Sequence, residues 1–141
     1  MSLRPILAAA VSIVAVGLLA QSNAGAQTGS QPAAASPAAG DPAKGQALFA
    51  ANCSTCHTDA KTSADSTTLS LYGVVGRKAG SNADFSYSPA MTNAAVIWTP
   101  EKLNAYLENP PSVVPGNVMY FPGLPDAGQR ADLIAYLSTL K

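Results

Sequence analysis

The sequence predicts an all-α domain with three main helices and long connecting loops. Helix-start signals occur at three places, Asp41-Pro42, Thr99-Pro100 and Asp126, and each is followed by a segment of helical composition. No segment shows the apolar–polar alternation of a half-buried strand. Residues 58–92 have little periodicity, and so long an irregular stretch in a compact domain needs something large to organise it.

The first helix is expected to begin at Asp41-Pro42 and to run through KGQALFAAN into CSTCH. Asp suits the N-cap, and Pro at the first helical position loses nothing because its amide would be unpaired there. Gly45 lies four residues before Phe49, so both fall on one face. Since a mid-helix glycine destabilises a helix by roughly 1 kcal/mol, we expect Gly45 to permit a close crossing by another helix. The alternative is a tolerated glycine on the surface.

The second main helix is expected to begin at Thr99-Pro100 and to end at Asn109. The segment after it, PPSVVPGNVMYFPGLP, contains five prolines and two glycines. It is predicted to be stiff, extended and not helical.

The last helix opens with Asp126 and Gln129 at capping-box spacing. Its apolar stripe at helical spacing consists of Leu133, Ile134, Leu137 and Leu140, with Tyr136 at the border.

Residues 1–26 are predicted to be a secretory signal peptide that is cleaved after Ala26. Arg4 gives the positive start, and residues 6–20 form an apolar run that ends shortly before the A-x-A signal at residues 24–26. The alternative is an uncleaved membrane anchor, although a spanning helix needs roughly 20 apolar residues. Residues 27–40 are rich in Ala, Pro and Ser and indicate a linker, which leaves 41–141 as the folded domain.

The charge content excludes some classes of partner. Eight Lys and Arg residues balance eight Asp and Glu residues, and only 11% of the chain is charged. There is no basic stripe, so we do not expect nucleic acid to bind. Cleavage after Ala26 removes Arg4 and no acid, which leaves seven basic and eight acidic side chains and a net charge of −1.

The two cysteines and the single histidine of the chain all lie in CSTCH, residues 53–57. A closed zinc site needs four ligands, and the adjacent Cys56 and His57 would ligate one ion awkwardly. A redox dithiol is typical of a strand-to-helix turn, whereas this motif follows a predicted helix. Covalent haem attachment is therefore favoured, with thiols adding to the two vinyl groups and His57 as the proximal iron ligand.

The second iron ligand has two candidates, Met91 and Met119. Met119 lies in the stiff proline-rich segment, where little chain entropy is lost when a weak thioether ligand binds. Met91 lies in a softer stretch, SYSPAMTNAA, and is also readily explained as a core methionine. Physical reasoning favours Met119 and leaves Met91 open.

Six blocks in order give the chain a family resemblance: GDPAKGQALFAANCSTCH, LYGVVGRKAG, FSYSPAM, IWTPEKLNAYLENP, PGNVMYFPGL and RADLIAYL. Over residues 40–141 it resembles the class I c-type cytochromes, close to the small soluble monohaem cytochromes c of bacteria and mitochondria. The resemblance implies a cytochrome c fold, in which three main helices and long loops wrap around one covalent haem c.

The resemblance also implies roles for individual residues. Cys53 and Cys56 match the thioether cysteines, His57 matches the proximal ligand, and Met119 matches the distal ligand in preference to Met91. Tyr87 and Trp98 match residues that hydrogen-bond a haem propionate, and Arg77 matches a buried cation near the propionates. Tyr106 matches a tyrosine whose hydroxyl approaches the methionine sulfur. Gly45, Phe49 and Tyr136 match residues at the crossing of the first and last helices.

The chain departs from the family pattern at five positions. Leu69 stands where a proline is usual, so the segment that faces the proximal histidine is expected to be looser. Asn117 stands where a threonine commonly contacts a propionate. Lysines that surround the haem edge in mitochondrial relatives are replaced by Pro111, Ser112 and Val118, which predicts weak electrostatic steering of redox partners.

The resemblance implies a periplasmic one-electron carrier with His/Met ligation, and not an enzyme. Expected partners are redox proteins, such as a quinol–cytochrome c oxidoreductase, a terminal oxidase, a dehydrogenase or a reaction centre. We expect a monomer without a membrane span in its mature form. The alternatives are a haem peroxidase or gas sensor with a labile Met119, and a cytochrome subunit tethered to a membrane through residues 27–40.

Overall fold

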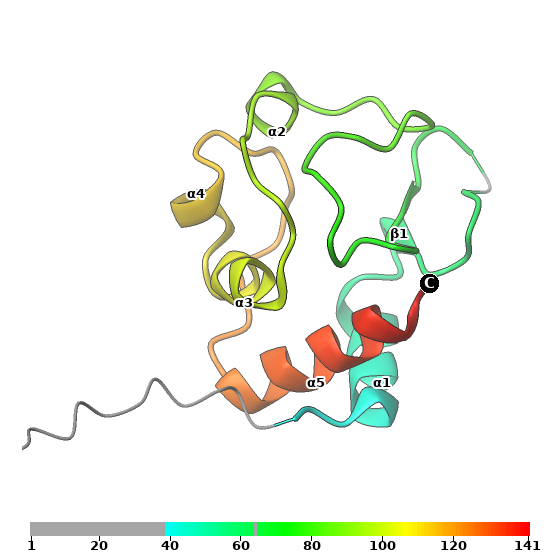
Figure 1. Ribbon diagram of the computed structural model, residues 1–141, viewed down its shortest axis with the longest axis vertical. Helices are drawn as coiled ribbons and strands as arrows, with labels where there is room; N and C mark the ends of the chain where they lie inside the picture. Colours follow the sequence, from blue (N-terminus) through cyan, green and yellow to red (C-terminus); the bar gives the residue numbers. More distant parts are fainter. Residues whose placement is uncertain (1–38, 64) are drawn as a thin grey trace, which may run out of the picture. The chain divides into compact units, whose positions relative to one another are not determined.

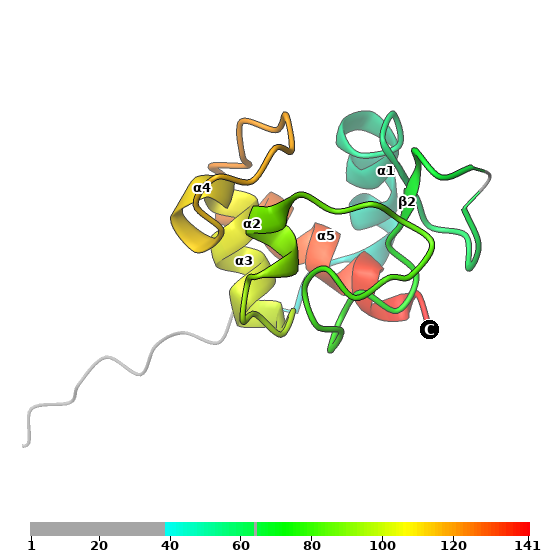
Figure 2. The same cartoon turned by 90° about the horizontal axis from the view of Figure 1, so that it is seen from above.

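The computed structural model describes residues 39–141 with the exception of residue 64. The predicted signal peptide, and the predicted linker apart from residues 39 and 40, lie outside the described residues. In chain order the elements are α1 (Pro42–Asn52), β1 (His57–Thr58), β2 (Leu69–Ser70), α2 (Pro89–Thr92), α3 (Pro100–Glu108), α4 (Pro110–Val113) and α5 (Ala127–Thr139) (Figures 1 and 2). The domain is mostly helical, and its main helices α1, α3 and α5 are the three that the sequence predicts.

Helices α1 and α5, from opposite ends of the domain, cross in direct contact in both views (Figures 1 and 2). A Cβ added to Gly45 would collide with the carbonyl oxygen of Asp132 and lie 2.7 Å from Cβ of Tyr136. The rings of Phe49 and Tyr136 pack beside this contact with centroids 5.7 Å apart. The predicted close crossing at Gly45 is therefore confirmed, and its physical cause is the space that a missing side chain leaves.

Each main helix begins after the N-cap residue that the sequence predicts. The side chain of Asp41 accepts hydrogen bonds from the amides of Ala43 and Lys44. The side chain of Thr99 accepts one from Lys102, and that of Asp126 accepts one from Gln129. These contacts satisfy amides that have no partner in the first turn of a helix.

The proline-rich segment after α3 begins with a short helix, so the expectation that it is not helical is wrong for residues 110–113. Prolines occupy the first two positions of α4, where the fixed φ suits a helix and no donor is lost. The amide of Val114 then donates to the carbonyl of Pro110 at 3.0 Å. A second short helix, α2, begins after Ser88, whose side chain accepts from the amide of Met91.

Short backbone ladders fix the long loops between α1 and α3. Strands β1 and β2 pair in parallel, with His57 opposite Leu69. Residues 76–79 pair with residues 96–98 through an antiparallel bridge between Lys78 and Ile97. These ladders span only two residues or so, which is too short for a period-2 pattern to be recognised in the sequence. None of the helices in the described residues is both long and apolar enough for a membrane crossing.

Candidate functional site

The CSTCH segment follows the last turn of α1 and turns back sharply. Cys53 caps α1 through its amide, which donates to the carbonyl of Phe49 at 2.8 Å. The carbonyl of Cys53 in turn accepts from the amides of Cys56 at 3.1 Å and His57 at 2.9 Å. Both cysteines are free thiols, Cys53 half-buried and Cys56 exposed. Burial raises the pKa of the Cys53 thiol to about 11.

The imidazole of His57 is oriented by the segment that pairs with it. Its Nδ1 lies 3.3 Å from the carbonyl oxygen of Leu69 and donates to it, which leaves Nε2 free as a ligand atom. Burial lowers the pKa of His57, while the hydrogen bond to Leu69 opposes this shift. The neutral imidazole that results is the form that binds a metal ion.

Leu69 is not the weak point that its place in the family pattern suggests. Its carbonyl still accepts the hydrogen bond from Nδ1 of His57, and its amide donates to the carbonyl of Cys56 at 3.3 Å. A proline has no amide hydrogen and could not make the second bond. The substitution thus ties the facing segment to CSTCH at one additional point.

Met119 contacts a buried aromatic pair. The hydroxyl of Tyr106 donates to its sulfur at 3.9 Å, and the rings of Tyr106 and Trp98 pack with centroids 4.8 Å apart. Burial raises the pKa of Tyr106 to about 12, so the phenol keeps its proton and remains a donor. Met91, the other candidate, packs against the core from α2.

Arg77 and Tyr87 extend this group of residues away from Met119. The backbone amide of Trp98 donates to the carbonyl of Arg77 at 2.9 Å. The guanidinium of Arg77 donates to the carbonyls of Ser70 and Tyr72, at 3.1 and 3.0 Å. Burial raises the pKa of Tyr87, and the positive charge of Arg77 opposes the rise. Trp98 is thus joined to Arg77 through the backbone and to Tyr106 by ring packing, and Tyr106 contacts Met119.

Asn117 hydrogen-bonds within its own loop. Its side-chain oxygen accepts from the amide of Met119 at 3.0 Å, and its Nδ2 donates to the carbonyl of Val114 at 3.2 Å. On either side of Met119, Val118 and Tyr120 are among the most exposed large apolar side chains of the described residues, at 78% and 105%. The exposed surface of this loop is thus apolar where mitochondrial relatives carry lysine.

Two polar residues near the site escaped the sequence reasoning. Arg130 is 5% exposed and anchors the far end of the Met119 loop. Its signal was its register, because it precedes Leu133, Ile134 and Leu137 by three, four and seven residues and so lies on the buried stripe. Asp59 accepts a hydrogen bond from the Tyr136 hydroxyl, which joins α5 to the segment just after CSTCH. A contact across 77 residues leaves no local sequence signal.

Comparison with known proteins assigns the family. Residues 42–141 match the family described as Cytochrome c. The chain belongs to the cytochrome c family. It is 47% identical over 98 residues to cytochrome c2 of Rhodopila globiformis, which covers 70% of this chain and 92% of that one. It is 44% identical over 98 residues to cytochrome c of Euglena viridis, with coverage of 70% and 95%.

A solved structure agrees with this family. Cytochrome cH from Methylobacterium extorquens superposes with a TM-score of 0.64 at 40% identity, over 71% of this chain and 99% of that chain. This cytochrome c is accordingly an electron carrier, its family consists of carriers and not enzymes, and CSTCH is its motif for covalent haem. His57 and Met119 lie near each other, as His/Met ligation requires.

The residues present fit a covalent haem. Two free thiols lie three residues apart on one turn, the adjacent imidazole has its Nε2 free, and a thioether sulfur lies near it. Met119, Tyr120, Phe121 and Pro122 line an open hollow at the methionine side.

Proposed function

We propose that this cytochrome c is an exported one-electron carrier in which His57 and Met119 would be the two protein ligands of the haem iron. The observation that carries this proposal is the pair of hydrogen bonds that orient the two ligands, from His57 Nδ1 to Leu69 and from Tyr106 to the Met119 sulfur. A bound haem supplies the iron that changes between the ferrous and ferric states.

The backbone and side chains of the protein orient the two ligands and adjust their chemistry. The Leu69 carbonyl holds the His57 ring in one orientation, and the Tyr106 hydroxyl donates to the thioether and so weakens it as an electron donor. A methionine ligand and a buried, water-poor setting both favour the reduced state. The ladders and the crossing helices hold the ligands in place, which limits reorganisation during transfer.

Roles near the propionates form part of the same proposal. Arg77 would supply the positive charge, and Tyr87 and Trp98 would supply an O–H and an N–H donor. The effect of the Arg77 charge on the pKa of Tyr87 and the backbone hydrogen bond from Trp98 to Arg77 support this grouping. With His57 and Met119 as ligands, the iron would have no position left for a substrate. The redox partners are respiratory or photosynthetic complexes in the periplasm, and the carrier acts as a monomer.

The absorption spectrum of the ferric protein, matured with haem in a bacterial periplasm, tests the ligation. We expect a weak methionine-sulfur-to-iron band in the far red that disappears in Met119→Ala. Met91→Leu is the matched control and is expected to keep the band. A band lost in Met91→Leu and kept in Met119→Ala would reverse the assignment, and a high-spin spectrum without the band would contradict the closed site.

Mass spectrometry of the mature protein tests export. We expect an N-terminus at Gln27, after cleavage of residues 1–26. A mature chain that retains residues 6–20 and sediments with membranes would replace the free carrier by a membrane-tethered cytochrome.

A further inference from the structure

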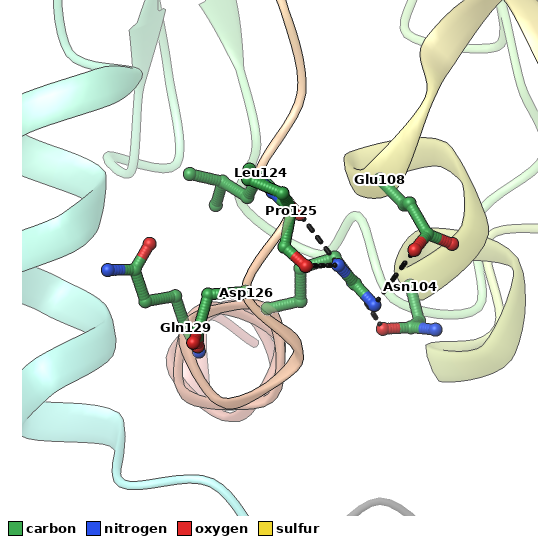
Figure 3. A network of polar contacts seen from close by, with 7 residues as sticks. Asn104, Glu108, Leu124, Pro125, Asp126 and Gln129 are labelled. Atoms are coloured by element: carbon green, nitrogen blue, oxygen red, sulfur yellow. Dashed lines mark hydrogen bonds and ion pairs between the residues drawn. The ribbon is translucent and has the colours of Figure 1, made fainter.

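The loop that carries Met119 ends at a cluster centred on a buried arginine. The Arg130 side chain, at the start of α5, is 5% exposed. Its Nη1 donates to the carbonyls of Leu124 and Pro125 at 2.7 and 2.8 Å. Figure 3 shows these two carbonyls on one side of the guanidinium and Asn104 and Glu108 of α3 on the other.

The second side of the cluster consists of polar groups on α3. The Nε of Arg130 donates to Oδ1 of Asn104 at 2.8 Å, and its Nη2 lies 3.3 Å from Oε1 of Glu108. The guanidinium therefore joins three parts of the chain: α5, α3 and the exit of the loop. A planar guanidinium can do this because its donors point in fixed directions in one plane.

Backbone contacts pin the same exit to α3. The amide of Leu124 donates to the carbonyl of Leu107 at 2.7 Å. Gly123 has φ of +96°, and a Cβ at this position would collide with the carbonyl of Glu108. Residues 123–125 are thus held from two directions, and Met119 lies only four residues before Gly123.

A loop held at its ends loses less entropy when its middle binds a ligand than a loop that is free at one end. We propose that Arg130 is a positioning residue for Met119. It keeps the loop exit on α3 and thereby lowers the fraction of molecules in which the Met119 sulfur has left the iron. The inference rests on the proposed His57/Met119 ligation and adds to it the group that keeps the second ligand in place.

Binding of imidazole to the ferric protein at neutral pH measures that fraction, because added imidazole can take the sixth position only when Met119 has left it. The apparent affinity is the intrinsic affinity multiplied by the open fraction. The variant is Arg130→Lys, which keeps the charge but loses the fork of donors. The matched control is Ile134→Val, a buried change one turn further along α5. Urea unfolding of both variants gives the global stability for comparison.

We expect Arg130→Lys to bind imidazole about tenfold more tightly than the unmodified protein, or about 1.4 kcal/mol, the size of one lost charged hydrogen bond. Ile134→Val is expected to stay within about twofold, because it removes one methyl group and none of the polar contacts of Arg130. Equal changes in the two variants at equal loss of stability would overturn the proposal, since Arg130 would then act on global stability alone.

Two further variants keep the test decisive if Arg130→Lys does not mature with haem. Asn104→Ala and Glu108→Ala each remove one partner of the guanidinium and leave Arg130 in place. Tighter imidazole binding in both supports the proposal, and unchanged binding in both overturns it. The Met119→Ala spectrum distinguishes failure of the proposed ligation from failure of the Arg130 role. If the unmodified protein has no far-red band that depends on Met119, the proposed His57/Met119 ligation is wrong.

Discussion

The hydroxyl of Tyr106 donates a hydrogen bond to the sulfur of Met119 at 3.9 Å. The phenol is buried against Trp98, so the sulfur receives this donor inside the core and not in water. A donor on a ligand sulfur reduces its electron donation to iron, which favours the reduced state.

Tyr106→Phe removes this donor and keeps the ring. We expect a lower reduction potential than in the unmodified protein, measured by redox titration. The free energy of unfolding should change by less than about 1 kcal/mol, because a thioether is a weak acceptor whose desolvation costs little. Tyr72→Phe, outside the Met119 contacts, serves as the control. An unchanged potential in Tyr106→Phe would contradict the donor role.

Two tyrosines should ionise late in the folded protein. The pKa of Tyr106 is raised to about 12 by burial, and that of Tyr136 is raised to about 12 by burial and then by its hydrogen bond to the Asp59 carboxylate and the charge of that group. We expect ultraviolet titration of tyrosinate to show a phase near pH 12 that loses one tyrosine in each of Tyr106→Phe and Tyr136→Phe. If the variants instead lose tyrosinate absorbance in the phase near pH 10, burial does not raise the pKa of these phenols.

The same pKa shifts make a stability prediction. A tyrosine whose folded pKa lies above its unfolded value of 10.0 binds its proton more tightly in the folded state. Its contribution to stability is complete below about pH 10 and is lost as pH rises through the folded value. Unfolding free energies measured between pH 9 and pH 12 should therefore fall less steeply in Tyr106→Phe.

The helix crossing should be sensitive to a single methyl group. Gly45→Ala places a Cβ against the Asp132 carbonyl and 2.7 Å from the Tyr136 Cβ, so α1 and α5 must separate. We expect a loss of about 1–3 kcal/mol in denaturant unfolding, despite the better helix propensity of Ala. Gly128→Ala, at the exposed start of α5, is the matched control and should change stability by less than about 1 kcal/mol. Similar losses in both would contradict the close-crossing explanation.

Asn117 should act on Met119 through the backbone. Asn117→Ala removes both hydrogen bonds of the side chain, to the Met119 amide and to the Val114 carbonyl. We expect the free energy of unfolding to fall by about 1–2 kcal/mol and imidazole to bind the ferric protein more tightly. Asn117→Asp keeps the acceptor for the Met119 amide, so its free energy of unfolding and its imidazole affinity should lie between those of Asn117→Ala and the unmodified protein. If Asn117→Asp is as destabilised as Asn117→Ala and binds imidazole as tightly, the hydrogen bond to the Met119 amide contributes nothing.

The apolar surface beside Met119 should make encounter with charged partners nearly independent of salt. Val118→Lys places a positive charge on a side chain that is 78% exposed, so reduction by an anionic redox complex should speed up and become more dependent on ionic strength. Ala47→Lys, on the exposed side of α1, adds the same net charge elsewhere. A steep salt dependence in the unmodified protein, or equal slopes in the two variants, would contradict this prediction.

Local signals made most of the fold predictable. Asp41, Thr99 and Asp126 start the main helices because their side chains accept from first-turn amides, an interaction that lies within three residues. The short helix at residues 110–113 was missed because consecutive prolines look like helix breakers, although they are tolerated in a first turn.

The site was predictable where its residues carry distinctive chemistry. CSTCH and Met119 stand out because few residue types bind haem iron or its vinyl groups. Asn117 and Asp59 could not be assigned from the sequence, because their importance depends on which backbone or side-chain group the fold brings to them. The burial of Arg130 was visible in its register on α5, but its partners on α3 were not.

The crossing of α1 and α5 also sets an order of events in maturation. It joins groups as far as 91 residues apart, such as the Asp41 amide and the Asp132 carboxylate. Helix α1 has 11 residues, of which only Gly45 and Phe49 are buried, and a helix this short is marginal in isolation. We therefore expect α1 to be unstable in the exported chain until α5 docks, with the thiols of CSTCH accessible for haem attachment. Docking of α5 then supplies the partner that α1 lacks, so the last residues of the domain to be exported complete the helix that leads into CSTCH.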